Sequence, residues 1–215
     1  MFALYGIFTG AICGYTARES ALKLAEPPLS GQKLRIWVLC AAAVCTLCGC
    51  VIGGGEVYLP GSFRLITALA ALTGATVCDL QGKRIPNLFP LALLCVYLLS
   101  GALDWILVPE TGAASYIGGL VAGGVLLLLL LLFRGVSLLL FHQQGIGRGD
   151  LRLLTALGCV LGLNGAVGTL LAGQIMALLA AAGLIITKKA TLKDTLPLAP
   201  FLWAGLALNI LLQIL

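Results

Sequence analysis

Long apolar stretches alternate with short polar ones along the whole chain. A helix needs roughly 20 apolar residues to cross the hydrocarbon core of a membrane, and somewhat fewer where the bilayer thins. The pattern predicts eight crossings, near 2–17, 36–54, 65–79, 88–107, 115–140, 151–163, 166–187 and 198–214. The sixth is short for a crossing, which indicates a tilted or re-entrant segment, and the turn "LNG" separates it from the seventh. We therefore expect an all-α, polytopic transmembrane bundle of about eight segments, within a range of six to eight.

The composition agrees with a membrane protein. Hydrophobic residues make up 60% of the 215 residues and charged residues only 10%, whereas soluble domains carry roughly a quarter charged residues. Many of the 28 glycines lie inside apolar runs such as "GGLVAGGV", where small residues let helices approach closely. The first residues, "MFALYGIFTGAICGY", lack a basic region and an A-x-A cleavage site, so they are expected to form a retained helix. We expect a single integral membrane domain over 1–215.

The basic residues predict how the chain is oriented. With eight crossings the loops alternate sides, and eleven of the thirteen Lys and Arg residues fall into one set of loops. They are Arg18, Lys23, Lys33, Arg35, Lys83, Arg84, Arg148, Arg152, Lys188, Lys189 and Lys193. The positive-inside rule assigns these loops to the cytoplasm and both termini to the outside. The net charge of +5 is then a topology signal that also attracts anionic membrane lipids, and it does not indicate a nucleic-acid partner.

The eight cysteines do not form a metal-binding pattern. Nearly all of them lie within apolar runs, where Cys commonly behaves as a small hydrophobic residue. The segment "CTLC" has the spacing of half a zinc site, but no second CxxC pair or His partner completes four ligands. The sequence predicts no metal and no cofactor.

Two acidic residues lie where a membrane protein rarely has them. Asp79 ends an apolar run in "VCDLQGKRIPN", and Asp150 opens the sixth segment in "GIGRGDLRLL". Placing an Asp in the centre of a membrane helix costs roughly 2.5 to 3.5 kcal/mol on insertion scales. Under the topology above, one segment ends and the other begins in the same cytoplasmic leaflet. The two carboxyl groups are therefore expected to meet.

A pair of neighbouring carboxyl groups suits the hydrolysis of a peptide bond. In a partly dehydrated site two such groups do not both ionise cheaply, so one keeps a proton while the other stays a base. The base takes a proton from water, and the protonated partner polarises the carbonyl oxygen. Glycines beside Asp150, including Gly147 and Gly149, allow a substrate strand to approach closely. Pro86 forces a helix-ending turn after Asp79.

Structural explanations exist for each acid taken alone. Asp150 fits the N-cap of the helix "LRLLTALG", where an Asp accepts a backbone N–H and suits the helix dipole. Asp79 with Lys83 at i+4 fits an ordinary ion pair at a helix end. The pair in one leaflet, each acid beside unusual backbone residues, favours a joint role.

Other functional classes use such acids as well. Intramembrane carboxylates often mark ion routes, so a small transporter or ion pathway is the main alternative. That alternative expects polar groups throughout the bilayer depth, whereas the central parts of these segments are mostly Leu, Ala, Gly and Val. A third alternative is a scaffold of a secretion or pilus machine, in which the acids are structural.

The two acidic segments together resemble the signature segments of the type IV prepilin peptidase family, aspartic membrane proteases of the GxGD type. In this family an Asp precedes a basic stretch and Ile-Pro-Asn, as Asp79 does in "DLQGKRIPN", and a second Asp ends Gly-x-Gly-Asp, as Asp150 does. A weaker match is "LPLAPFLWAG", near the last helix. The resemblance spans roughly 60–210, which we interpret as the catalytic core.

The resemblance implies a function and a set of residues. Family members cleave basic leader peptides from pilin-like precursors, whose hydrophobic helix follows the leader, at the cytoplasmic face of a prokaryotic membrane. Asp79 and Asp150 take the catalytic positions in this comparison. The residues that would shape the site are Lys83, Arg84, Pro86, Asn87, Gly147, Gly149 and Arg152.

One family feature is missing from the chain. Many bacterial relatives carry an insertion with two zinc-binding CxxC pairs, and they also methylate the new N-terminus with S-adenosylmethionine. The first predicted cytoplasmic loop here is "RESALKLAEPPLSGQKLR", which contains no cysteine. The sequence therefore favours a compact, peptidase-only form without zinc.

Overall fold

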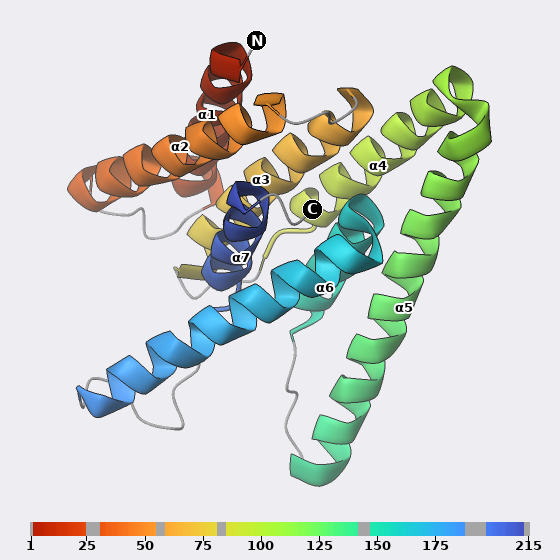
Figure 1. Cartoon of the computed structure of the whole chain (residues 1–215). Helices are drawn as coiled ribbons and strands as arrows, with labels where there is room; N and C mark the ends of the chain where they lie inside the picture. Colours follow the sequence, from red (N-terminus) through yellow and green to blue (C-terminus); the bar gives the residue numbers. More distant parts are fainter. Residues whose placement is uncertain are drawn as a thin grey trace.

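A computed structural model describes residues 2–24, 31–54, 59–80, 85–141, 147–187 and 197–212. Throughout these ranges the regular structure is helical (Figure 1). The elements are α1 (Phe2–Glu19), the π-helical turn η1 (Ser20–Leu24), α2 (Gly31–Gly54), α3 (Leu59–Leu80), α4 (Leu88–Leu107), α5 (Pro109–Phe141), α6 (Arg148–Ile186) and α7 (Ala199–Leu211). The expected all-α bundle is confirmed.

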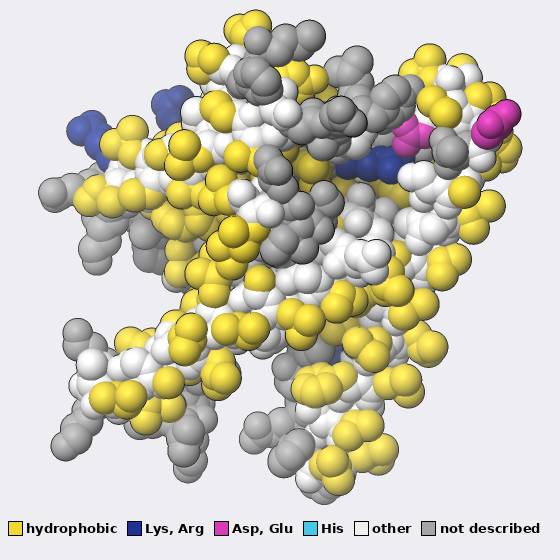
Figure 2. Space-filling view, viewed as in Figure 1, with side chains coloured by type: hydrophobic (Ala, Val, Ile, Leu, Met, Phe, Trp, Pro, Cys, Tyr) yellow, Lys and Arg dark blue, Asp and Glu magenta, His cyan; other side chains and the backbone are white. Residues whose placement is uncertain are grey.

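Several helices are suited to cross a membrane. Helices α2 to α6 each contain a segment long and apolar enough to span it, and α7 is a shorter apolar helix. Large apolar side chains are exposed along α5 and α6, among them Leu128, Leu132, Leu171 and Leu178. Figure 2 shows that hydrophobic side chains cover most of the visible surface of these two helices. Such a surface is stable against lipid and not against water, so the chain is a multi-pass membrane protein.

A glycine divides α6 into two arms. Gly162 has φ 70° and ψ 178°, a backbone conformation that is open almost only to glycine. The first arm (148–161) runs beside α5, and the second arm (163–186) turns away from it (Figure 1). The sequence predicted two segments here and placed the turn at 163–165, one residue too late. The turn falls at Gly162 because it requires a positive φ, at which Leu163 or Asn164 would be strained.

Small residues set the closest helix contacts. A methyl group added at Gly49 of α2 would lie 2.5 Å from the Thr9 hydroxyl of α1. One added at Gly119 of α5 would lie 2.5 Å from the carbonyl oxygen of Cys159 in α6. Helices in lipid gain little from the hydrophobic effect, so they associate through close van der Waals packing of this kind.

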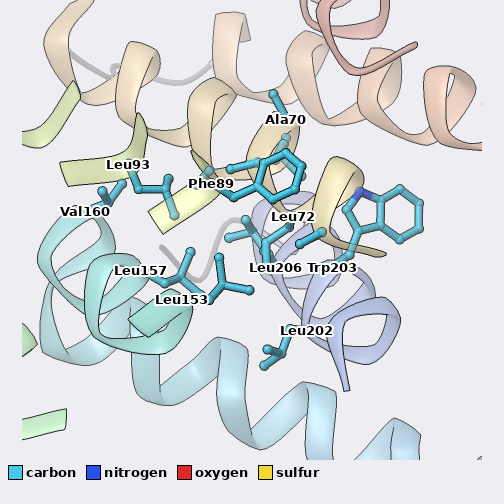
Figure 3. Packing of buried hydrophobic residues seen from close by; sticks show 14 of the residues in the cluster. Ala70, Leu72, Phe89, Leu93, Leu153, Leu157, Val160, Leu202, Trp203 and Leu206 are labelled. Carbon is cyan, nitrogen blue, oxygen red and sulfur yellow. The ribbon is translucent and has the colours of Figure 1, made fainter. Parts of the chain in front are cut away.

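The core of the bundle joins α3, α4, α6 and α7. Figure 3 shows Leu153 and Leu157 of α6 close to Leu93 of α4, with Leu206 of α7 and Leu72 of α3 completing the cluster. All five of these side chains are fully buried. This packing holds the C-terminal end of α3 against the N-terminal ends of α6 and α7, which is where the two acidic residues lie.

The cysteines of "CTLC" lie in the same core. Cys45 and Cys48 are fully buried. The Cys45 sulfur is 3.9 Å from the Thr73 hydroxyl, and the Cys48 thiol donates to the carbonyl oxygen of Ala207 at 3.8 Å. They act as small apolar residues with a weak S–H donor, as the sequence indicated.

Candidate active site

Asp79 lies in the last turn of α3 and caps a different helix. Its half-buried carboxylate accepts a hydrogen bond at 2.8 Å from the backbone N–H of Ala199, the first residue of α7. The backbone N–H of Leu198 also donates to it. The N-cap residue of α7, Leu198, has no side-chain oxygen, so α7 needs an acceptor from elsewhere. Asp79 supplies that acceptor and is held in place by it.

Asp150 lies in the first turn of α6, at the third helical position. The N-cap of α6 is Gly147, with φ −67° and ψ 153°, and Asp150 accepts a hydrogen bond from its backbone N–H. In a capping box, the side chain at the third helical position accepts a hydrogen bond from the backbone N–H of the N-cap residue, and Asp150 makes this bond. The explanation of Asp150 as the N-cap residue is therefore wrong, because the helix begins at Arg148 and not after the Asp.

The carboxyl groups of Asp79 and Asp150 lie within electrostatic reach of each other. They lie near enough for the negative charge of Asp79 to act directly on Asp150. Both side chains are half-buried, so each is partly shielded from solvent. Two negative charges in a partly buried site repel each other, and protonation of one carboxyl group relieves the repulsion. The site thus favours one carboxylate and one carboxylic acid over two carboxylates.

The segment that follows Asp79 also packs against the segment that carries Asp150. A Cβ added at Gly149 would lie 3.3 Å from the Cβ of Ile85 and 3.4 Å from its carbonyl oxygen, so only a glycine packs there without displacement. The Arg152 Nη1 donates to the Asn87 Oδ1 at 2.6 Å. Asn87 is the N-cap residue of α4, yet its side chain makes no cap bond, because it accepts from Arg152 instead. These contacts fix the start of α4 relative to Asp150.

The remaining expected site residues are placed as follows. Pro86 lies between Ile85 and Asn87, in the turn that opens α4, and a Cβ at Gly147 would lie 3.1 Å from the Asp150 Oδ2. Lys83 and Arg84 lie outside the described residues, as does the proposed Asp79–Lys83 pair. Over the described ranges, no three His, Cys, Asp or Glu residues are grouped to hold a metal ion.

The sequence did not predict that the start of α7 contributes to the site. Leu198 and Ala199 contribute only their backbone N–H groups. Nearly every residue type has this group, so the sequence does not indicate its role. The segment "LPLAPFLWAG" gave the available signal, since prolines at an apolar helix entry indicate a fixed helix start.

Comparison with known proteins identifies the family. The model of the Type IV leader peptidase family matches residues 65–182, which is more than half of the chain. A search of curated proteins and a search of solved structures found no match. The matched region contains both acids, the Ile-Pro-Asn turn and the Gly-Arg-Gly-Asp segment that packs against it. The chain therefore belongs to the Type IV leader peptidase family.

Proposed function

We propose that this peptidase-family protein is an aspartic endopeptidase that removes basic leader peptides from type IV prepilin-like precursors. Asp79 and Asp150 form its catalytic dyad. The observation that supports this most is that these two acids, which both lie in the matched region and are 71 positions apart in the sequence, are within electrostatic reach of each other. The proposed location is the cytoplasmic membrane of a prokaryote, with the dyad on the cytoplasmic side.

The proposed chemistry uses one proton shared by the dyad. The ionised carboxylate removes a proton from a water molecule, and the water oxygen attacks the carbonyl carbon of the scissile bond. The protonated partner donates to the carbonyl oxygen, which gives a tetrahedral diol. When the C–N bond breaks, the protonated member of the dyad gives its proton to the leaving amine, and the other member takes the proton of a diol hydroxyl, so the dyad again holds one proton. Because the pair titrates as a unit, neither role is assigned to one Asp.

The surroundings of the dyad support this chemistry by orienting both groups. Backbone N–H groups of α7 bind one carboxylate and the N–H of Gly147 binds the other, so neither side chain turns freely. Preorganisation of this kind lowers the entropy that must be lost in the transition state.

Co-expression with a prepilin-like precursor tests the proposal. We expect the precursor to become shorter on a gel, and mass spectrometry of the product to place the new N-terminus after a basic leader. The peptidase-only form predicts that this terminus carries no methyl group. A precursor that stays full length beside well-expressed, membrane-inserted protein would contradict the proposed activity.

The contact between Asn87 and Arg152 gives a further prediction. We expect Asn87→Ala and Arg152→Gln each to lower the processing rate about tenfold, because each frees the start of α4 from the segment that carries Asp150. The double variant is expected to be no slower than either single variant. Processing rates of the three variants measure this coupling. Effects that multiply in the double variant would show that the two residues act independently.

A further inference from the structure

The two acids of the dyad differ in their surroundings. Both carboxyl groups are half-buried, so burial does not distinguish them. Asp79 is bound by the start of α7, a helix to which it does not belong, whereas Asp150 is bound by the N-cap residue of its own helix. The hydrogen bonds that each carboxyl group accepts are thus the main difference between them.

The start of α7 has two backbone N–H groups without a partner in the helix, and Asp79 accepts both. Among the first four residues, counted from the N-cap residue Leu198, Pro200 has no N–H, and Phe201 donates to the carbonyl oxygen of Leu198 at 3.1 Å. The N–H groups of Leu198 and Ala199 remain, and they donate to the Asp79 carboxyl group. Every backbone donor in this turn therefore has a partner, and two of the partners are one carboxyl group.

Asp150 has fewer donors. The N–H of Gly147 is the backbone donor that acts on it. A carboxylate gains more from an N–H donor than a carboxylic acid does, so two donors against one favour the negative charge on Asp79. The dipoles of α3 and α6 favour the charge on Asp150, whereas that of α7 favours it on Asp79. Such helix-end effects are weaker than direct hydrogen bonds to a charged group.

Other charged side chains lie on the elements at this end of the bundle. Those that the structure describes are Arg18 and Glu19 of α1, Arg35 of α2, Arg134 of α5, and Arg148 and Arg152 of α6. Arg152 is bound to the Asn87 side chain. The backbone changes described below leave all of these charges in place, so the charges do not account for a difference between the variants.

We propose that Asp79 is the ionised base of the dyad and Asp150 its protonated acid, and that the start of α7 sets these roles. This assignment rests on the proposed function. Asp79 takes a proton from the attacking water, and Asp150 donates its own proton to the carbonyl oxygen of the scissile bond. When the C–N bond breaks, Asp79 gives its proton to the leaving amine, and Asp150 takes the proton of a diol hydroxyl. Leu198 and Ala199 are positioning residues, because they act only through Asp79.

Exchange of single backbone N–H groups for ester oxygens tests the assignment. Ala199→lactic acid removes one donor from Asp79, and Gly147→glycolic acid removes the donor from Asp150. Both changes keep the side chain, so each variant is the control for the other. The measurement is the rate at which the purified full chain processes a prepilin-like precursor, as a function of pH. This rate falls at low pH, where the base becomes protonated, and at high pH, where the acid loses its proton.

The two variants are expected to move opposite sides of the pH profile. The ester at 199 raises the midpoint of the low-pH fall by about one pH unit and leaves the high-pH midpoint in place, because the base has lost a donor. The ester at 147 raises the high-pH midpoint by about one pH unit and leaves the low-pH midpoint in place. Each variant decides the assignment by itself, so one that does not fold leaves the other as the test.

Two results would overturn the assignment while the wild type is active. The first is the reverse pattern, in which the ester at 199 moves the high-pH midpoint or the ester at 147 moves the low-pH midpoint. The second is an ester at 199 that moves neither midpoint, which would show that α7 does not set the roles. A wild type that leaves the precursor intact at every pH would instead overturn the proposed function, and this assignment with it.

Discussion

Asp79→Asn and Asp150→Asn are each expected to slow precursor processing by at least about a thousandfold, the scale seen when one member of a catalytic unit is removed. An amide can neither take a proton from water nor share one with its neighbour, so either change breaks the proposed cycle. The measurement is the rate of precursor shortening by membranes that contain each variant at equal amount. Processing at more than about a tenth of the wild-type rate in either variant would remove that acid from the dyad.

The Asn variants are informative because they preserve the structural role of each acid. Their amide oxygen still accepts the N–H of Ala199 or of Gly147, so both helix starts keep a cap. Asp79→Leu, by contrast, leaves the start of α7 without an acceptor and is expected to lower stability by about 1 kcal/mol. A scaffold function predicts that Asn works at both positions and that Leu fails. A peptidase predicts that Asn and Leu fail alike.

The helices could be read almost directly from the sequence. The apolar stretch expected at 88–107 is the observed extent of α4. The reason is physical, since a membrane segment must satisfy its backbone internally and must match the bilayer in length. The predicted bounds were less exact where packing between helices sets the helix start. Helix α5, for example, begins at Pro109 and not at 115.

The site could be predicted only in part. Ile-Pro-Asn and Gly-x-Gly-Asp are local patterns, and both segments were found. The hydrogen bond from Ala199 to Asp79 joins residues 120 positions apart. Its donor is a backbone N–H, so the residue types do not predict it. The contact between Asn87 and Arg152 was likewise not predicted, because the resemblance named both as site-shaping residues without pairing them.

Arg64 of α3 and Asp104 of α4 are 40 positions apart in the sequence, and no sequence pattern pairs them. In the structure their side chains form a buried ion pair, with Arg64 also 5.6 Å from the ring centre of Tyr97. The second carboxylate oxygen of Asp104, Oδ1, has no hydrogen-bond partner in the described part of the chain. Within the described residues, the Asp104 carboxylate is therefore stabilised mainly by the contact between Oδ2 and the guanidinium. We expect the loss of either residue to lower the free energy of unfolding strongly.

Asp104→Leu is expected to destabilise the protein by about 3 to 5 kcal/mol, because it leaves the Arg64 charge buried without a partner. Replacing both residues, in Arg64→Met with Asp104→Leu, removes the charge as well and is expected to restore most of that loss. Glu110→Gln, an exposed acid in the first turn of α5, is the control and is expected to change stability by less than about 0.5 kcal/mol. Denaturant unfolding in mixed micelles measures all three. If the single and double variants are equally unstable, the loss comes from packing around the pair and not from an unpaired charge.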